Sequence, residues 1–167
     1  MPAVRAGPRT LVVPCLVALA STAAACGETR KTGSVGDKLE AKRIEVTVEK
    51  VDRRTPVPRS DITGLSLPSS GHRLVGVLVN VCNDYGAVVG QFDFELETST
   101  GEATPKYTAR NYRESFQSVR DDCERGWIVF EIPEESRPTK VEFAFDESGT
   151  NRNTQDNLTA RFEWKVE

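Results

Sequence analysis

The sequence predicts an all-β protein that folds as one antiparallel sandwich of about seven to eight strands. Apolar residues recur with a period of two in several short segments, which is the pattern of half-buried strands. Turn residues separate these segments, and no window outside residues 1–25 shows the 3.6-residue apolar repeat of a helix. We therefore expect two facing sheets joined by Greek-key connections, with a closed barrel as the alternative.

Six segments carry the clearest strand signals. Four alternate between apolar and polar residues, which places one face in the core and one in water. Two are apolar throughout, as central strands are. The alternating segments are 44–49, 92–97, 141–146 and 158–166, and the apolar ones are 73–83 and 127–132. In the second alternating segment Phe92, Phe94 and Leu96 face the core in this prediction. A weaker strand pair is expected at 106–110 and 112–119.

Residues 1–25 have the features of an export signal. Arg5 and Arg9 precede an apolar run over 11–20, small residues follow at 21–25, and the stretch has no acidic residue. The apolar part is shorter than the roughly 20 residues that a transmembrane helix needs. Because the two Arg are not adjacent, a twin-arginine route is not indicated. We expect removal of residues 1–25 on export.

The last residues of this signal, Ala23-Ala24-Ala25-Cys26, resemble the lipobox of bacterial lipoproteins. In that motif the Cys thiol carries a diacylglycerol, and acyl chains such as palmitate contribute about 0.8 kcal/mol per buried methylene at a membrane. Ala23 stands where Leu is usual, so cleavage without lipidation is the alternative. Residues 26–36 are small and polar and are predicted to form a flexible tether, which leaves 37–167 for the sandwich.

The charge of the chain argues against nucleic acid as a partner. The formal net charge is −3, and loss of the two Arg of residues 1–25 makes it −5. This mild acidity disfavours phosphate backbones and anionic lipid headgroups, so the lipid on Cys26 would be the contact with the membrane. One His and one Met leave few side chains for metal or redox chemistry, and no cofactor or metal is expected.

Cys82 and Cys123 are predicted to form a disulfide. Both remain after removal of the export signal, and exported proteins meet an oxidising compartment. Cys82 ends one predicted core strand and Cys123 precedes another, so the two can approach each other. The alternative of free thiols or a redox pair lacks a Cys-x-x-Cys motif.

The segment Asp52–Gly71 is long for a connection between strands and contains several Pro and Gly residues. Ile62, Leu65 and Leu67 make it more apolar than a solvated linker requires. We expect a long loop folded over one end of the sandwich. The alternative is a binding loop whose three apolar residues contact a ligand or partner.

No catalytic residue is predicted. The Ser66 and His72 pair falls short of a nucleophile elbow because Pro68 occupies the second glycine position of Gly-x-Ser-x-Gly. Two sets of acidic residues also lack the spacing of a calcium loop and are interpreted as solvated faces. These sets are Asp93, Glu95 and Glu97, and Asp121, Asp122 and Glu124.

Six stretches of the sequence occur in an order and spacing typical of one family. They are Val35-Gly36-Asp37, Ile44–Val48, Val75–Val81, Phe92–Leu96, Gly126–Pro133 and Pro138–Phe143. Together they resemble the telokin-like, immunoglobulin-fold family of bacterial secreted lipoproteins called domain-of-unknown-function family 4352. That family usually has a Pro-Gly turn before the fifth stretch, where this sequence has residues 121–125. The resemblance implies an immunoglobulin-like sandwich in the cell envelope and no agreed activity.

These observations lead to an expected function. We expect a non-enzymatic binding or structural module, held at the extracytoplasmic face of the cell membrane by the lipid on Cys26. Its partner would be an unidentified envelope protein or ligand. A secreted, unanchored ligand-binding protein of antigen type is the first alternative, and a hydrolase is the second.

Overall fold

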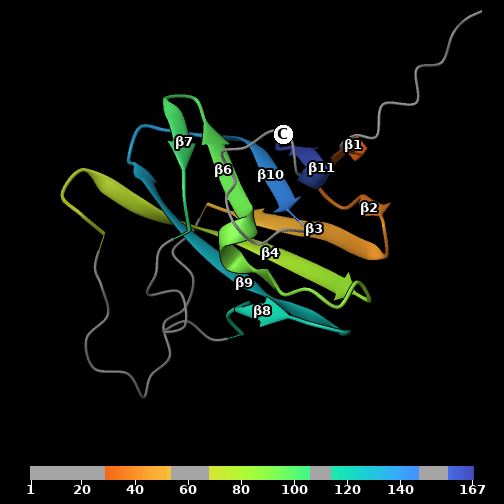
Figure 1. Ribbon diagram of the computed structural model, residues 1–167. Coiled ribbons are helices and arrows are strands. Elements are labelled where there is room, and N and C mark those ends of the chain that lie inside the picture. Colours follow the sequence, from red (N-terminus) through yellow and green to blue (C-terminus); the bar gives the residue numbers. More distant parts are fainter. Residues whose placement is uncertain (1–28, 54–67, 106–113, 147–157) are drawn as a thin grey trace, which may run out of the picture.

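The structure is a computed structural model that describes residues 29–53, 68–105, 114–146 and 158–167. Within these ranges the chain forms eleven strands and one short 3-10 turn, η1 (Figure 1). In chain order these elements are β1 Thr29–Ser34, β2 Lys38–Ala41, β3 Ile44–Asp52, β4 His72–Asn83, β5 Val89–Gly90, η1 Gln91–Asp93, β6 Phe94–Thr98, β7 Gly101–Ala103, β8 Ser118–Val119, β9 Asp122–Pro133, β10 Pro138–Asp146 and β11 Leu158–Lys165.

The strands form two main sheets that face each other as a sandwich, which confirms the predicted all-β class. One sheet has the order β1-β11-β10-β6-β7, and the other has the order β2-β3-β4-β9. A small pair, β5 with β8, completes the arrangement. All of these strand pairs are antiparallel except β1 with β11, which is parallel.

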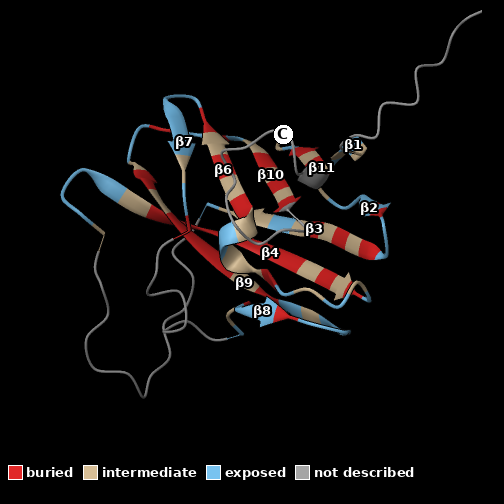
Figure 2. Ribbon diagram, viewed as in Figure 1, coloured by how far each residue is buried: buried red, intermediate tan, exposed pale blue. Residues whose placement is uncertain are grey.

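The core lies between the two sheets. Along β4 every second residue from Val75 to Val81 is fully buried and points inward, and Figure 2 shows the buried positions of β4, β9 and β10. Opposite them, aromatic rings of neighbouring strands pack against one another: Phe143 lies with its ring centroid 5.0 Å from that of Phe94 and 5.6 Å from that of Phe162. Large rings fill the space that two sheets leave between them.

Part of the segment predicted as a flexible tether forms strand β1. Thr29 lies opposite Ala160 and Ser34 opposite Lys165, so six residues of the expected tether extend the first sheet. Their sequence, Thr-Arg-Lys-Thr-Gly-Ser, has no apolar alternation. Its backbone groups are satisfied by the edge of β11, a partner more than 120 residues away that no local pattern can reveal.

Phe92 also departs from the prediction. It was expected to face the core with Phe94 and Leu96, but it lies in η1 and is 45% exposed. The turn begins at Gly90, whose N–H donates to the Asp93 side chain at 2.7 Å. This local hydrogen bond closes a turn where the sequence pattern suggested a continuous strand.

The crossing from β1 to β2 joins the two sheets. Gly36 has φ +102°, a left-handed angle that favours glycine, and its N–H donates to the Val48 carbonyl at 2.8 Å. The indole N–H of buried Trp164 donates to the Asp37 carbonyl at 2.9 Å. The turn is thereby attached to β3 on one side and to β11 on the other.

The segment before β8 places the side chain of Phe116 in the core. Phe116 is fully buried, its ring lies 6.0 Å from that of Phe94, and its N–H donates to the Trp127 carbonyl at 3.0 Å. Gly126 makes this approach possible, because a Cβ at Gly126 would lie 2.8 Å from both the Glu114 carbonyl oxygen and the Phe116 Cα.

Cys82 and Cys123 form the predicted disulfide. They are directly opposite each other in the β4–β9 pair, with Cα atoms 4.0 Å apart. The bond links neighbouring strands of one sheet, next to the end of β4 and the start of β9.

Several predicted features lie outside the described residues. They are residues 1–25, Cys26, and Ile62, Leu65, Ser66 and Leu67 within the long loop. Most of the weaker strand pair, over 106–113, also lies outside. In the described ranges no helix is both long and apolar enough to cross a membrane.

Substitution of Gly126 by Ala should lower stability, because the added methyl collides with backbone atoms that cannot move without breaking the Phe116 hydrogen bond. We expect a loss of about 1–3 kcal/mol in the free energy of unfolding measured with urea. Gly90→Ala is the matched control, since its added Cβ would find only an ordinary 3.5 Å contact with the Gln117 carbonyl oxygen. Equal losses in both variants would contradict the explanation.

Replacing both disulfide cysteines by Ser should keep the fold and lower the free energy of unfolding by roughly 2–4 kcal/mol, since the bond restricts the unfolded chain. Far-ultraviolet circular dichroism reports the fold, and denaturant unfolding of residues 27–167 reports the stability. Two reactive thiols in the native, air-oxidised protein would rule out the bond.

Candidate functional site

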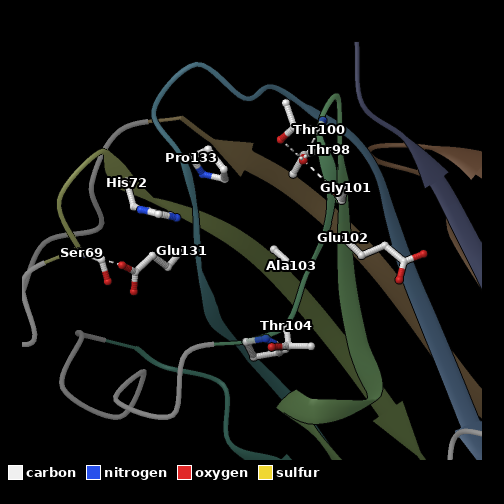
Figure 3. Close-up of a pocket in the computed structure, with 11 residues that line it drawn as sticks. Ser69, His72, Thr98, Thr100, Gly101, Glu102, Ala103, Thr104, Glu131 and Pro133 are labelled. Carbon is white, nitrogen blue, oxygen red and sulfur yellow. Dashed lines mark hydrogen bonds between the residues drawn. The ribbon is translucent and has the colours of Figure 1, made fainter.

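A pocket opens at one end of the sandwich, where β4 begins, β9 ends and the β6–β7 hairpin turns (Figure 3). Its volume of about 520 Å³ lies in the range of small-molecule sites. The pocket is lined by Ser69, His72, Thr98, Thr100, Gly101, Glu102, Ala103, Thr104, Pro105, Glu131 and Pro133.

One wall of the pocket comes from the sheet that contains β4 and β9. His72 lies opposite Pro133 in the strand register, and Leu74 lies opposite Glu131. The Glu131 carboxylate accepts a hydrogen bond of 2.5 Å from the Ser69 N–H, which holds the chain entering β4 against β9. Figure 3 shows His72, Ser69 and Glu131 grouped on this wall.

The His72 ring is oriented by its own chain. Its Nδ1 lies 3.1 Å from the Ser70 carbonyl oxygen, so in the neutral ring Nδ1 carries the proton and donates to that oxygen. The other ring nitrogen, Nε2, is then an acceptor. His72 is exposed, so this acceptor is accessible to a ligand from solvent.

The other wall is the β6–β7 hairpin of the opposite sheet. Thr98 donates its hydroxyl to the Gly101 carbonyl at 2.7 Å and accepts the Thr100 N–H at 3.3 Å. Thr100 and Ser136 are joined through their hydroxyls. Gly101 has φ +144°, an angle that side chains rarely adopt, so the hairpin needs glycine for its backbone. The tip is therefore a hydrogen-bonded, preformed wall.

The two walls together present mainly hydrogen-bond acceptors. Glu131 supplies a carboxylate and His72 supplies Nε2, whereas the Thr98 hydroxyl is already bonded within the hairpin tip. Glu102 belongs to the same lining, but Figure 3 shows its side chain pointing away from the His72 wall. Such a surface suits a polar ligand that donates hydrogen bonds, and a carboxylate gives the strongest bonds to a cationic donor.

The pocket lacks the geometry of a nucleophilic enzyme in the part of the chain that the structure describes. There the His72 ring bonds to a backbone carbonyl rather than to a serine or cysteine side chain. In the same ranges no group of three His, Cys, Asp or Glu side chains converges as a metal site.

The predicted acidic cluster is used in local structure. Asp122 accepts the Cys123 N–H at 2.7 Å, and Glu124 accepts the Gln117 N–H at 3.4 Å.

The end pocket was not predicted from the sequence. Glu131 and Thr98 stand among ordinary strand residues, and the only signal was that polar residues follow the ends of strong strand segments.

A row of carboxylates crosses the outer face of the five-stranded sheet. Glu95 lies opposite Glu142, and Glu142 lies opposite Glu163. Burial raises the pKa of the Glu142 carboxyl above its usual range, and the two neighbouring carboxylates add to the increase. The Lys140 ammonium lies 3.8 Å from the Glu142 carboxylate and lowers the pKa of that group. It lies closer to the Glu97 carboxylate, at 2.8 Å.

Comparisons with known proteins give the fold only. No protein-family model matches the sequence, and no curated protein matches it. Among solved structures, the chain is similar to MPT63, a secreted protein from Mycobacterium tuberculosis, with a TM-score of 0.52 and 17% identity over 81% of this chain and 96% of that one. It is also similar to the yjhA protein from Bacillus subtilis, with a TM-score of 0.50 and 14% identity over 83% of this chain and 100% of that one.

Glu142→Gln should stabilise the protein at pH 7. Since folding raises the pKa of this group, the folded state binds its proton more tightly, and stability falls as pH rises from the unfolded pKa through the folded pKa. Removing the charge should therefore raise the free energy of unfolding by a few tenths to about 1 kcal/mol above that range. The gain should disappear near pH 3.5, where the carboxyl is protonated in both states.

Urea unfolding at the two pH values measures this difference. Glu135→Gln is the matched control, because Glu135 is exposed in the turn between β9 and β10. A gain for Glu142→Gln that does not depend on pH would contradict the electrostatic explanation.

Proposed function

We propose that this chain is an extracytoplasmic lipoprotein that acts as a non-enzymatic binding module, with its ligand site in the end pocket. The observation that supports it best is the pocket itself, in which two strand ends and a hairpin from opposite sheets bring acceptor groups together. Sandwich proteins use such ends for recognition because the sheets hold them in place.

Export is supported by two independent features. Residues 1–25 have the composition of an export signal. The Cys82–Cys123 bond needs an oxidising compartment to form and persist. The similar fold of MPT63 belongs to a secreted protein, and an exported location for this chain agrees with that.

The anchor in this proposal is the lipid on Cys26. The residues Ala23-Ala24-Ala25-Cys26 support it, because small residues before the Cys suit cleavage and thiol acylation. The acyl chains would hold the protein on the extracytoplasmic face of the cell membrane. The alternative is an unanchored secreted protein cleaved after Ala25.

For the pocket we propose a ligand with hydroxyl or amino donors. Glu131 and Nε2 of His72 are acceptors on one wall, and the exposed Thr100 lies on the other. An amine would donate a charge-assisted hydrogen bond to the carboxylate, and a ligand hydroxyl would donate to Nε2 of His72. Glucosamine combines both groups and is therefore a suitable probe.

Intact mass of protein extracted from membranes should show a chain that begins at Cys26 and carries a diacylglycerol. Cys26→Ala should remove the added mass and release the protein from the membrane fraction, because the thiol is the site of attachment. An unmodified chain with another N-terminus would contradict lipidation and favour the secreted alternative.

Titration with glucosamine should shift the amide signals of His72 and Ala103 in nuclear magnetic resonance spectra, because these residues lie on opposite walls of the pocket. Glu131→Gln should weaken binding by about tenfold or more, the loss expected for a hydrogen bond to a charged group. Glu124→Gln, at the other end of β9, should leave binding unchanged. If glucosamine shifts the same signals equally in the Glu131→Gln variant, the amine does not bind at Glu131.

A further inference from the structure

Strand β1 begins only three residues after Cys26. Three peptide units span at most about 11 Å between Cα atoms, whereas a free tether over 26–36 would reach roughly 35 Å. If the lipid is on Cys26, as proposed above, the start of β1 is therefore held close to the membrane surface. The orientation of the sandwich inferred from this short link rests on that proposed anchor.

The strand register identifies which end of the sandwich this is. Thr29 lies opposite Ala160 near the start of β11, and Ala160 lies opposite Phe145 near the end of β10. The Tyr85 ring packs 5.8 Å from that of Phe145, which brings the loop after β4 to the same end. We call this the anchor end, and it also includes the turn of Lys42 and Arg43, because Ile44 lies opposite Asn83 at the end of β4.

Both large apolar side chains that are exposed in the described residues lie at the anchor end. Val88 is 47% exposed and directly precedes β5, in the loop that follows β4. Phe92 is 45% exposed in η1, which directly precedes β6, and the first residue of β6, Phe94, lies opposite Phe143 of β10. Apolar side chains at an end that faces a bilayer can enter its interface, where their burial is favourable.

The turn at this end also exposes two cationic residues, both of which have positive φ angles. Lys42 and Arg43 have φ of +48° and +69°, a conformation that usually selects Asn-Gly in a two-residue hairpin. Asp84, Asp121 and Asp122 lie at the same end and outnumber these two cations, so the lipid, rather than the cations, would supply the affinity.

The parts of the pocket formed by Thr98 and His72 lie at the opposite end. β1 runs away from its start in parallel with β11, and Lys165 near the end of β11 lies opposite Lys140, which lies opposite Glu97 next to Thr98 of the pocket. Eight residues of β11 span about 26 Å at 3.3 Å per residue. A sandwich standing on its anchor end thus carries the Thr98 and His72 side of the pocket far from the lipid.

We propose that the anchor end rests on the bilayer surface, with Val88 and Phe92 at the lipid interface, and that the pocket faces away from the membrane. The occupant of this surface is the phospholipid bilayer, and the short link from Cys26 imposes the orientation. The pocket is then open to soluble ligands of the envelope rather than to lipids.

The test uses the full lipidated chain in phosphatidylcholine vesicles that contain a doxyl-labelled lipid as quencher. Phe92→Trp places a fluorescent indole at the anchor end, and Glu135→Trp places one in the β9–β10 turn near the pocket. The added fluorescence of Phe92→Trp should be largely lost in the vesicles, and that of Glu135→Trp should be retained. The reverse pattern, or equal quenching, overturns the proposed orientation.

Two controls separate this proposal from the anchor itself. Intact mass is measured first: an unacylated chain refutes the anchor and the orientation with it, whereas an acylated chain with quenching at Glu135→Trp refutes only the orientation. A ten-residue Gly-Ser insertion before Thr29 should restore the fluorescence of Phe92→Trp, since it lengthens the link. The unlipidated chain could instead form a dimer that is lost after Phe92→Ser. That result would show that Val88 and Phe92 form an interface between two copies of the chain, and it would overturn the proposal.

Discussion

The pairing of β4 with β9 is the constraint on which the rest of the structure depends. Twelve consecutive residues of each strand are in register, from His72 opposite Pro133 to Asn83 opposite Asp122. The middle of this ladder provides the buried valines of one sheet. Its two ends serve different purposes, since one carries the disulfide and the other forms a wall of the pocket. A slip of one residue would turn the buried face outward and separate the two cysteines.

The two sheets are held together by a few specific contacts besides general apolar burial. The Trp164 indole joins β11 to the turn that leads into the other sheet, and Phe116 enters the core beside Phe94. Both contacts depend on glycines, Gly36 for its backbone angle and Gly126 for the missing Cβ. The close packing of Phe116 therefore explains the glycine at position 126, and the left-handed backbone of the β1–β2 turn explains the one at position 36.

The architecture separates the two functional features proposed for the chain. The link to the membrane enters at the start of β1, and the pocket lies where β4 begins and the β6–β7 hairpin turns. Strands of eight to twelve residues keep these ends about 26–40 Å apart along the chain direction. A binding module built this way can hold its site outward without a long tether.

The all-β class, the main strands and the disulfide could be predicted from the amino-acid sequence alone. Period-two alternation reports one buried face, and it is a local property that Ile44, Val46 and Val48 already display. If Cys26 carries the lipid, only two thiols remain in the exported chain, and they allow only one internal pair. Three other features emerged only from the folded chain: residues 29–34 form a strand, Phe92 is exposed, and Glu131 and Thr98 share a pocket. The first depends on β11 and the last on strands of opposite sheets, and pairing between distant segments leaves no periodic trace in either one.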